Sequence, residues 1–252
     1  MLNIARIAGD AILKVYRTDF DVYFKEDMSP LTKADKWAHD IIQNGLDNLT
    51  PSIPILSEEG VNIAYEERLA WERYWLVDPL DGTKEFVNKN DEFTVNIALI
   101  ENNFPVFGVV YAPVLDRMYW GRSNMESYKL IKNRSLEKIL VKSQTINPIQ
   151  IEVSRSHPSD KINKFISQFD EYNLIQMGSS LKICSVSDGS VHFYPRFGPT
   201  MEWDTAASHA ILRGAGGELI KHGTNKPICY NKEHLRNPEF IAGKVDLIQS
   251  LR

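Results

Sequence analysis

The sequence is poor in cysteine, and its basic residues form no long cluster. Only two cysteines, Cys184 and Cys229, occur in 252 residues, and they form neither a CxxC pair nor another zinc-binding spacing. This count does not indicate a disulfide-stabilised secreted fold, so we expect both thiols to be reduced. The net charge is −4 and the lysines and arginines are scattered. A basic surface that follows a polymeric nucleic acid or an anionic membrane is therefore not expected.

Long apolar runs are absent as well. No stretch approaches the roughly 18 to 20 apolar residues that cross a bilayer, so we expect no transmembrane segment. Apolar residues near the N-terminus recur at helical spacing and are interrupted by Arg6, Asp10 and Lys14, which predicts an amphipathic core helix and not a signal peptide. We expect a globular cytoplasmic protein, and the sequence leaves peripheral association with the inner membrane open.

Patterns in the first half of the chain predict an antiparallel sheet. An apolar strand is predicted at 74–77, where it ends at an Asp-Pro-Leu-Asp-Gly-Thr segment. The ranges 93–100 and 106–111 are rich in strand-forming residues, and 101–105 between them has the composition of a hairpin turn. A further short strand at 118–120 completes the predicted sheet.

The stretch before this sheet predicts a loop followed by a helix. Residues 27–31 contain Asp, Ser and Pro and are typical of a loop. Thr32 followed three residues later by Asp35 resembles a capping box, so Asp35 is expected in the first turn of a second helix.

Beyond about residue 141 the pattern becomes an α/β alternation. A strand at 151–154 precedes a helix predicted at 160–169. A second helix is predicted from Asp204 as its N-cap to Ala215, where two glycines stop it. We therefore predict an N-terminal half at 1–140 and a C-terminal half at 141–252, packed tightly because no flexible linker or repeat separates them.

Asp78 and Asp81 are candidate metal ligands at the end of the predicted buried strand. Pro79 restricts φ between them, and Gly82 permits close backbone approach. Magnesium prefers such oxygen ligands, together with phosphate oxygens of a substrate. A solvated turn is the alternative, because Asp, Pro and Gly are common in turns. The three-residue spacing differs from the DxD spacing of haloacid-dehalogenase phosphatases, so no aspartyl-phosphate intermediate is implied.

Two segments, WLVDPLDGTKEF at 75–86 and MEWDTAASHAILRGAGG at 201–217, resemble the signature of the inositol-monophosphatase-like, lithium-sensitive phosphatases. Within that superfamily the chain is similar to the bacterial 3'(2'),5'-bisphosphate nucleotidases. This likeness is carried by LSEEG, EFTVNIALI, GVVYAP, GSSLK and YPRFGPT, and it runs almost from end to end. The resemblance implies a sugar-phosphatase fold, an α/β protein layered as an α/β/α/β/α sandwich.

The resemblance also implies a set of metal ligands for about two to three magnesium ions. The expected ligands are the carboxylates of Glu58, Asp78, Asp81 and Asp204 and the backbone carbonyl of Leu80. Taken alone, Glu58 is equally well a surface acid. Asp204 alone is more readily explained as a helix cap, although a capping position would also place its carboxylate near a bound phosphate.

Two further residues are implied to act on water. Thr83 corresponds to the threonine that orients the attacking water, and Asp35 to the acid that polarises it, with Glu58 helping to aim it. For Asp35 the alternative is simple stabilisation of the first turn of a helix. Since phosphoryl transfer depends mostly on positioning and charge neutralisation, no covalent intermediate is expected.

The second half of the chain is expected to select the substrate. Side chains that match nucleotide-binding positions of the nucleotidase branch are His157, Ser179, Lys182 and Arg196, and Asp81, Gly82, Thr83 and Asp204 are also expected to contact the substrate. A hydroxyl, an ammonium and a guanidinium suit a second, non-transferred phosphate. Lys182 and Arg196 are alternatively surface charges, and His157 a loop histidine. His192 departs from the acidic residue that many relatives have at that position.

The implied reaction is removal of the 3'-phosphate from adenosine 3',5'-bisphosphate, which gives AMP and phosphate and clears a by-product of sulfate activation. The 5'-phosphosulfate analogue is implied as a second substrate. Two alternatives remain open at this point. An inositol or other sugar-phosphate phosphatase would share the metal ligands, and an inactive nucleotide-binding sensor would retain only binding.

Overall fold

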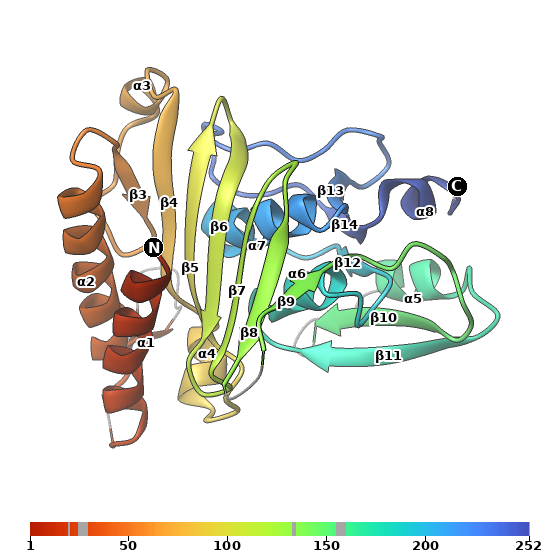
Figure 1. Ribbon diagram of the computed structural model, residues 1–252, viewed down its shortest axis with the longest axis horizontal. Coiled ribbons are helices and arrows are strands. Elements are labelled where there is room, and N and C mark those ends of the chain that lie inside the picture. The colour runs from red at the N-terminus through yellow and green to blue at the C-terminus, as the bar shows by residue number, and fades with distance from the viewer. Residues whose placement is uncertain (20, 25–29, 133–134, 155–159, 252) are drawn as a thin grey trace.

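The structure is a computed structural model that describes residues 1–19, 21–24, 30–132, 135–154 and 160–251. Its elements form five layers in the order helix, sheet, helix, sheet, helix (Figure 1). The helical layers are α1 (Leu2–Tyr16) with α2 (Lys33–Leu49), α6 (Leu181–Ser187) with α7 (Glu202–Gly214), and α5 (Asp160–Ile166) with α8 (Val245–Gln249). This arrangement confirms the predicted α/β/α/β/α sandwich.

The first layer matches the predicted helices closely. The amphipathic N-terminal segment forms α1, and α2 begins after the N-cap Thr32, whose backbone N–H donates to the Asp35 carboxylate at 2.7 Å. The predicted capping box is therefore confirmed. The loop prediction for 27–31 is wrong at its end, because Pro30–Leu31 form the short strand β2 opposite β1 (Tyr23–Phe24); residues 27–29 lie outside the described part of the chain.

The larger sheet has the strand order β3-β4-β5-β6-β7-β8-β9. The bounds of these strands are Ile55–Ser57, Arg73–Asp81, Thr94–Glu101, Phe104–Ala112, Arg117–Arg122, Ser127–Ile131 and Glu137–Ile139. β3 and β4 are parallel and the other neighbours antiparallel, which confirms the predicted antiparallel sheet. Asn102 and Asn103 close the β5–β6 hairpin with positive φ, as two-residue turns of this kind require.

β4 differs from its prediction because it does not end before the Asp-Pro-Leu-Asp segment. The strand continues through Asp81, with a register shift against β5 between Asp78 and Asp81. A bulge of this kind re-aims side chains next to a site. Two short helices flank this sheet, α3 (Tyr65–Arg68) and α4 (Thr83–Val87), and α4 follows the bulge directly.

The smaller sheet layer combines a parallel pair and a three-stranded antiparallel group. The pair is β10 (Ile149–Ser154) with β11 (Tyr172–Met177), and the group has the order β12 (Tyr194–Arg196), β14 (Phe240–Gly243) and β13 (Glu218–Lys221). A parallel bridge between Ile151 and Phe193 joins them. The α/β alternation predicted for the second half is confirmed, although α5 ends at Ile166, three residues before its predicted end.

The helix predicted from Asp204 begins two residues earlier. α7 starts at Glu202 with Met201 as its N-cap, so the N-cap prediction for Asp204 is wrong. Asp204 is the third helical residue, and its carboxylate accepts the Met201 N–H at 2.9 Å. The sequence pattern cannot separate these positions, because an aspartate satisfies free N–H groups from either one.

Three apolar cores lie between the five layers. Alternation along the strands of the larger sheet divides them: Trp75 and Val77 pack under α1 and α2, whereas Tyr74 and Leu76 face α6 and α7. A third core lies between the smaller sheet layer and the helices α5 and α8. The middle core joins residues from both predicted halves, and the division at residue 140 stays a prediction.

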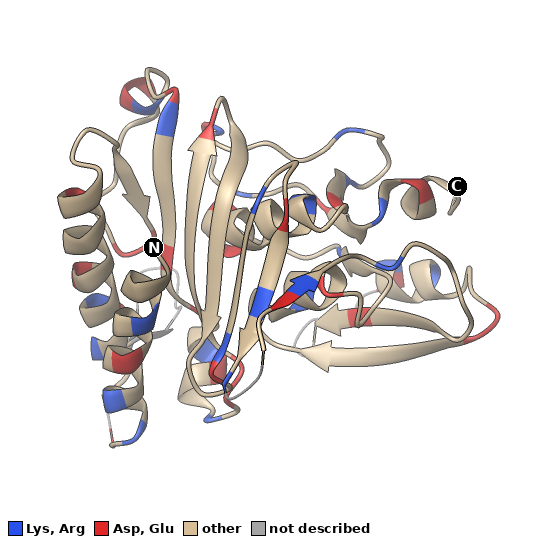
Figure 2. Ribbon diagram, viewed as in Figure 1, with Lys and Arg blue, Asp and Glu red and all other residues tan. Residues whose placement is uncertain are grey.

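The cysteines, the length and apolarity of the helices and the distribution of charge can be compared with the sequence predictions. Cys184 is buried and Cys229 exposed, and both are free thiols. Within the described ranges, no helix has the length and apolarity needed to span a membrane. Figure 2 shows acidic and basic residues interspersed along α1 and α2 and over the loops at the sheet ends.

Close contact between β6 and α7 depends on Gly108. A Cβ at this position would lie 2.1 Å from the Ala207 carbonyl oxygen on the α7 backbone. We predict that Gly108→Ala lowers the free energy of unfolding by about 1 to 3 kcal/mol, because α7 must move away from the sheet. Urea denaturation measures this, with Gly198→Ala as the control, since the nearest atom there is 3.6 Å away. Equal stability of the two variants would contradict this account of the contact.

Candidate active site

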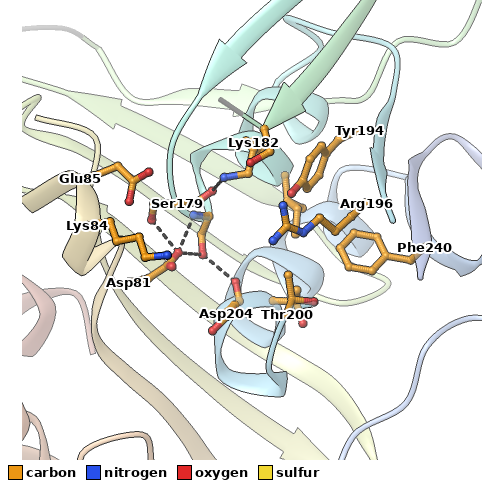
Figure 3. A pocket seen from close by; sticks show the side chains of 15 residues that line it. Asp81, Lys84, Glu85, Ser179, Lys182, Tyr194, Arg196, Thr200, Asp204 and Phe240 are labelled. Carbon is orange, nitrogen blue, oxygen red and sulfur yellow. Dashed lines mark hydrogen bonds between the residues drawn. The ribbon is translucent and has the colours of Figure 1, made fainter. Parts of the chain in front are cut away.

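A polar pocket lies where β4, α4, α6 and α7 meet, between the two sheet layers. Figure 3 shows Asp81 and Asp204 on one side of it and Tyr194 and Arg196 on the other. Its lining residues are Asp81, Gly82, Lys84, Glu85, Ser154, Ser179, Ser180, Lys182, Ile183, Tyr194, Arg196, Thr200, Asp204, Thr205 and Phe240. The pocket therefore combines residues from both halves of the sequence.

Three of the predicted metal ligands lie together at this site, and two of them, Asp81 and Asp204, line the pocket. Asp78, Asp81 and Asp204 each offer a carboxylate oxygen, and these atoms lie within 4.8 Å of one another. Asp78 and Asp81 come from the bulged end of β4, whereas Asp204 comes from the first turn of α7. Tertiary packing thus brings together carboxylates that are 123 positions apart in the sequence, from 81 to 204.

The electrostatics of this cluster fit a divalent cation. Burial, followed by the charges of Glu58, Asp81 and Asp204, raises the pKa of Asp78 well above its ordinary value. Burial and the charge of Asp81 raise the pKa of Asp204 in the same direction. A cation held among the oxygens would oppose both effects, since an opposite charge favours the ionised carboxylates. The donor set consists of oxygen atoms, as magnesium and calcium prefer.

Glu58 and Leu80 lie beside the cluster. Glu58 follows β3, and its backbone N–H donates to the Val77 carbonyl at 3.1 Å, which holds it next to the end of β4. Its charge is the second cause of the raised pKa of Asp78, after burial. The Leu80 carbonyl accepts from the Thr83 hydroxyl at 3.3 Å. The structure places both residues at the site, and their action as metal ligands stays a prediction.

Asp81 is held by a set of donors that the sequence patterns did not indicate. One of its carboxylate oxygens accepts from the Ser180 N–H at 2.6 Å and lies 2.6 Å from the Ser179 hydroxyl. The Ser180 hydroxyl is 2.7 Å away, and the Asn96 amide donates at 3.4 Å. Such partners orient a ligand carboxylate before any metal binds.

The sequence contains only weak indications of these partners of Asp81. Ser180 lies in the GSSLK segment beside the predicted Ser179. Asn96 is buried in the middle of the otherwise apolar strand β5, and a buried polar residue in such a strand needs a partner. Which partner it meets is decided by the register of β4 on β5.

The turn after β4 positions Thr83 against Asp35. Gly82 adopts φ +89°, which L side chains rarely adopt, and α4 starts immediately after it. The Thr83 hydroxyl lies 3.4 Å from an Asp35 oxygen. The other Asp35 oxygen accepts the Thr32 N–H and the Thr32 hydroxyl, both at 2.7 Å. The structure thus places Thr83 and Asp35, the two residues predicted to act on water, next to each other, although they come from different elements.

Asp35 is almost completely buried, at 2% exposure. Burial raises its pKa to about 6, against the two Thr32 hydrogen bonds, which lower it. Asp35 is therefore mostly ionised above neutral pH and can accept a proton there. One oxygen of Asp35 thus caps the helix and the other faces Thr83, and its action on water stays a prediction.

The opposite wall of the pocket is basic. Lys182 is 9% exposed, and its ammonium donates to the Ser179 carbonyl at 2.6 Å. Arg196 donates from Nη2 to the Pro199 carbonyl at 2.8 Å, while its buried Nε has no hydrogen-bond partner among the described residues. Ser179, Lys182 and Arg196 thus lie at one pocket, as predicted, and their contacts with substrate stay predictions. His157 lies outside the described residues.

Comparisons with known proteins agree with this architecture. A 3'(2'),5'-bisphosphate nucleotidase CysQ from Salmonella typhimurium is 47% identical over 241 residues, which cover 94% of this chain and 96% of the relative. The protein of the same name from Escherichia coli K12 is 45% identical over 241 residues, with the same coverage. A crystal structure of CysQ from Bacteroides thetaiotaomicron superimposes with a TM-score of 0.86 at 41% identity, covering 97% of this chain and 95% of that one.

More distant structures share the fold. An inositol monophosphatase from Thermotoga maritima covers 99% of this chain and 92% of its own with a TM-score of 0.79, at 23% identity. Five alternating layers around a carboxylate cluster thus define a sugar-phosphatase-type α/β protein. Residues 2–247 match the inositol monophosphatase family, and the chain belongs to this family.

Crowding of the carboxylates generates a stability prediction. Asp78 and Asp204 have a higher pKa in the folded state than in the unfolded state. Their contribution to the free energy of unfolding is therefore fully present below the unfolded-state pKa, and it is lost as the pH rises through the folded-state pKa. At pH 7.5 without metal, Asp78→Asn should raise the free energy of unfolding by about 0.5 to 2 kcal/mol. Magnesium at 100 times its dissociation constant should stabilise the wild type by about 2.7 kcal/mol, and the variant far less.

Urea denaturation at pH 7.5 with and without magnesium measures both effects. Asp47→Asn is the matched control, because Asp47 lies exposed on α2. Equal stabilisation of wild type and Asp78→Asn by magnesium would contradict the assignment of Asp78 to a metal site.

Proposed function

We propose that this chain is a magnesium-dependent 3'(2'),5'-bisphosphate nucleotidase. In the proposed reaction, adenosine 3',5'-bisphosphate loses its 3'-phosphate and yields AMP and phosphate, and the 5'-phosphosulfate analogue is a second substrate. The observation that carries the proposal is one pocket with a carboxylate cluster on one wall and Lys182 with Arg196 on the other. Near full-length identity of 41 to 47% with proteins named CysQ supports it.

Glu58, Asp78, Asp81, Asp204 and the Leu80 carbonyl are the proposed metal ligands. Magnesium held there would neutralise charge on the transferred phosphoryl group and acidify water at the site. The chain's own contribution is rigidity. Asp81 is fixed by Ser179 and Ser180, and Asp204 by the backbone of Met201.

Thr83 and Asp35 are proposed to prepare the attacking water. The Thr83 hydroxyl has one proton, and its two acceptors are the Leu80 carbonyl and Asp35. When it donates to ionised Asp35, its lone pairs face outward and can accept a hydrogen bond from water. The water proton can then pass through Thr83 to Asp35, whose pKa of about 6 suits this role near neutral pH. No covalent bond to the protein is required.

Selection of a bisphosphate is proposed to depend on the basic wall. Nε of Arg196 is buried without a partner among the described residues, and such a donor is costly to leave unpaired. A second phosphate, remote from the one transferred, would satisfy this donor and the remaining protons of Lys182. A substrate without that group, such as an inositol monophosphate, leaves these donors without a phosphate partner.

This difference predicts the substrate preference. With magnesium saturating, kcat/KM for adenosine 3',5'-bisphosphate should exceed that for inositol 1-phosphate by at least about 100-fold, because a site built for a polar group rejects analogues that lack it. Phosphate release from both compounds, measured at equal enzyme concentration, decides this. A preference for inositol 1-phosphate would support the sugar-phosphate alternative, and nucleotide binding without phosphate release would support the sensor alternative.

Arg196→Lys tests the basic wall separately from the chemistry. A lysine keeps the charge but loses the planar fork that binds phosphate through two donors. We predict that KM for adenosine 3',5'-bisphosphate rises about tenfold while kcat changes little, since the loss is one of uniform binding. KM for adenosine 3'-monophosphate should not change. Arg122→Lys, at the exposed end of β7, is the control, and an unchanged KM in Arg196→Lys would argue against a second phosphate at this wall.

A further inference from the structure

A buried glutamate that the proposed reaction does not use lies behind the basic wall. Glu152 is the fourth residue of β10 and is 0% exposed. Its neighbours Ile151 and Val153 point into the apolar core that faces α5. Because side chains alternate along a strand, Glu152 points to the opposite face, together with Ser154, which lines the pocket.

Neither carboxylate oxygen of Glu152 has a well-formed hydrogen bond among the described residues; the nearby Ser185 hydroxyl, which donates to the Leu181 carbonyl at 3.0 Å, lowers the pKa of the glutamate. The backbone around it is well fixed, since its own N–H donates to the Phe193 carbonyl at 2.8 Å. A buried carboxyl group without partners is costly, so its retention here needs an explanation beyond packing. Ile175 lies beside it in the β10–β11 register and offers no polar group.

The cation that acts on Glu152 is Lys182. Burial is the largest cause of its shifted pKa, which is raised to about 8, and the charge of Lys182 is the next and opposes it. In return, the charge of Glu152 raises the pKa of Lys182, which burial and nearby Arg196 lower. The other titratable groups that face this carboxyl are Glu92 from the loop before β5, Asp188 at the end of α6, and Tyr194 from β12.

We propose that Glu152 is a positioning residue for Lys182 and that its carboxyl group controls how tightly the basic wall holds a phosphate group. Glu152 does not touch the substrate; it acts through the Lys182 ammonium, which lies at the pocket. This role rests on the proposed function, because it requires that Lys182 bind the second phosphate.

The charge state of Glu152 decides the effect. When protonated, Glu152 carries no charge and leaves the ammonium charge of Lys182 available to the pocket. When ionised, it neutralises Lys182 and repels an incoming phosphate across a region of low dielectric. The protonated form is therefore the binding-competent one. With a pKa of about 8, its population falls about tenfold between pH 7 and pH 9, and the apparent affinity falls in proportion.

Glu152→Gln tests this role, because glutamine keeps the shape of the protonated carboxyl and cannot ionise. We expect the dissociation constant of AMP, measured by calorimetry, to rise more steeply with pH in the wild type. The ratio of wild type to variant should increase about tenfold from pH 7 to pH 9. Titrations that both proteins share, including that of Lys182, cancel in this ratio. KM for adenosine 3',5'-bisphosphate should follow the same ratio, with the ratio of kcat values constant.

Three controls separate the outcomes. Glu171→Gln changes an exposed glutamate before β11 and should behave like the wild type at every pH, and thermal melting confirms that each variant is folded. KM for adenosine 3'-monophosphate, which lacks the 5'-phosphate, should show no such pH-dependent ratio. A constant ratio for AMP between pH 7 and pH 9 would overturn the role of Glu152 while leaving the proposed function intact. Failure of the wild type to bind AMP would overturn both.

Discussion

The structure depends on the close approach of several carboxylates in one partly buried place. Asp78, Asp81 and Asp204 lie within 4.8 Å of one another, and their mutual repulsion and burial raise the pKa values of Asp78 and Asp204. Such an arrangement is unfavourable without a cation. It persists because the β4 bulge, the first turn of α7 and the Ser179–Ser180 anchor fix its members from three directions. The carboxylate repulsion thus lowers the stability of this region, while the site is already arranged for a cation.

The five layers provide this rigidity. The larger sheet carries two acids on β4, and the middle helical layer carries the third acid together with Ser179, Ser180 and Lys182 at the start of α6. The smaller sheet layer adds Arg196 from β12 and, behind the wall, Glu152 from β10. Acids and cations therefore face each other across one pocket because adjacent layers present them. Close contact between layers, as at Gly108 against α7, fixes the positions of these side chains relative to one another.

Local sequence patterns predicted the elements well and their ends less well. Amphipathic spacing located α1, the capping box located α2, and the asparagine-rich turn located the β5–β6 hairpin. The end of β4 and the start of α7 were misplaced, since Asp and Pro are typical of turns but are tolerated in a bulge, and an aspartate serves a helix start from more than one position. Both errors fall at the site, where tertiary contacts override local preference.

Motifs in the sequence were enough to identify the acids and the family likeness, and that likeness implied the layered fold, because a motif can be read without knowing the tertiary structure. Only tertiary packing brings Ser180 and Asn96 to Asp81, places Thr83 next to Asp35, and leaves Glu152 buried where its charge interacts with that of Lys182. These pairs join residues far apart in the chain through strand register and layer packing. A pKa such as that of Asp35 or Glu152 likewise depends on burial and neighbouring charge, which no residue type carries on its own.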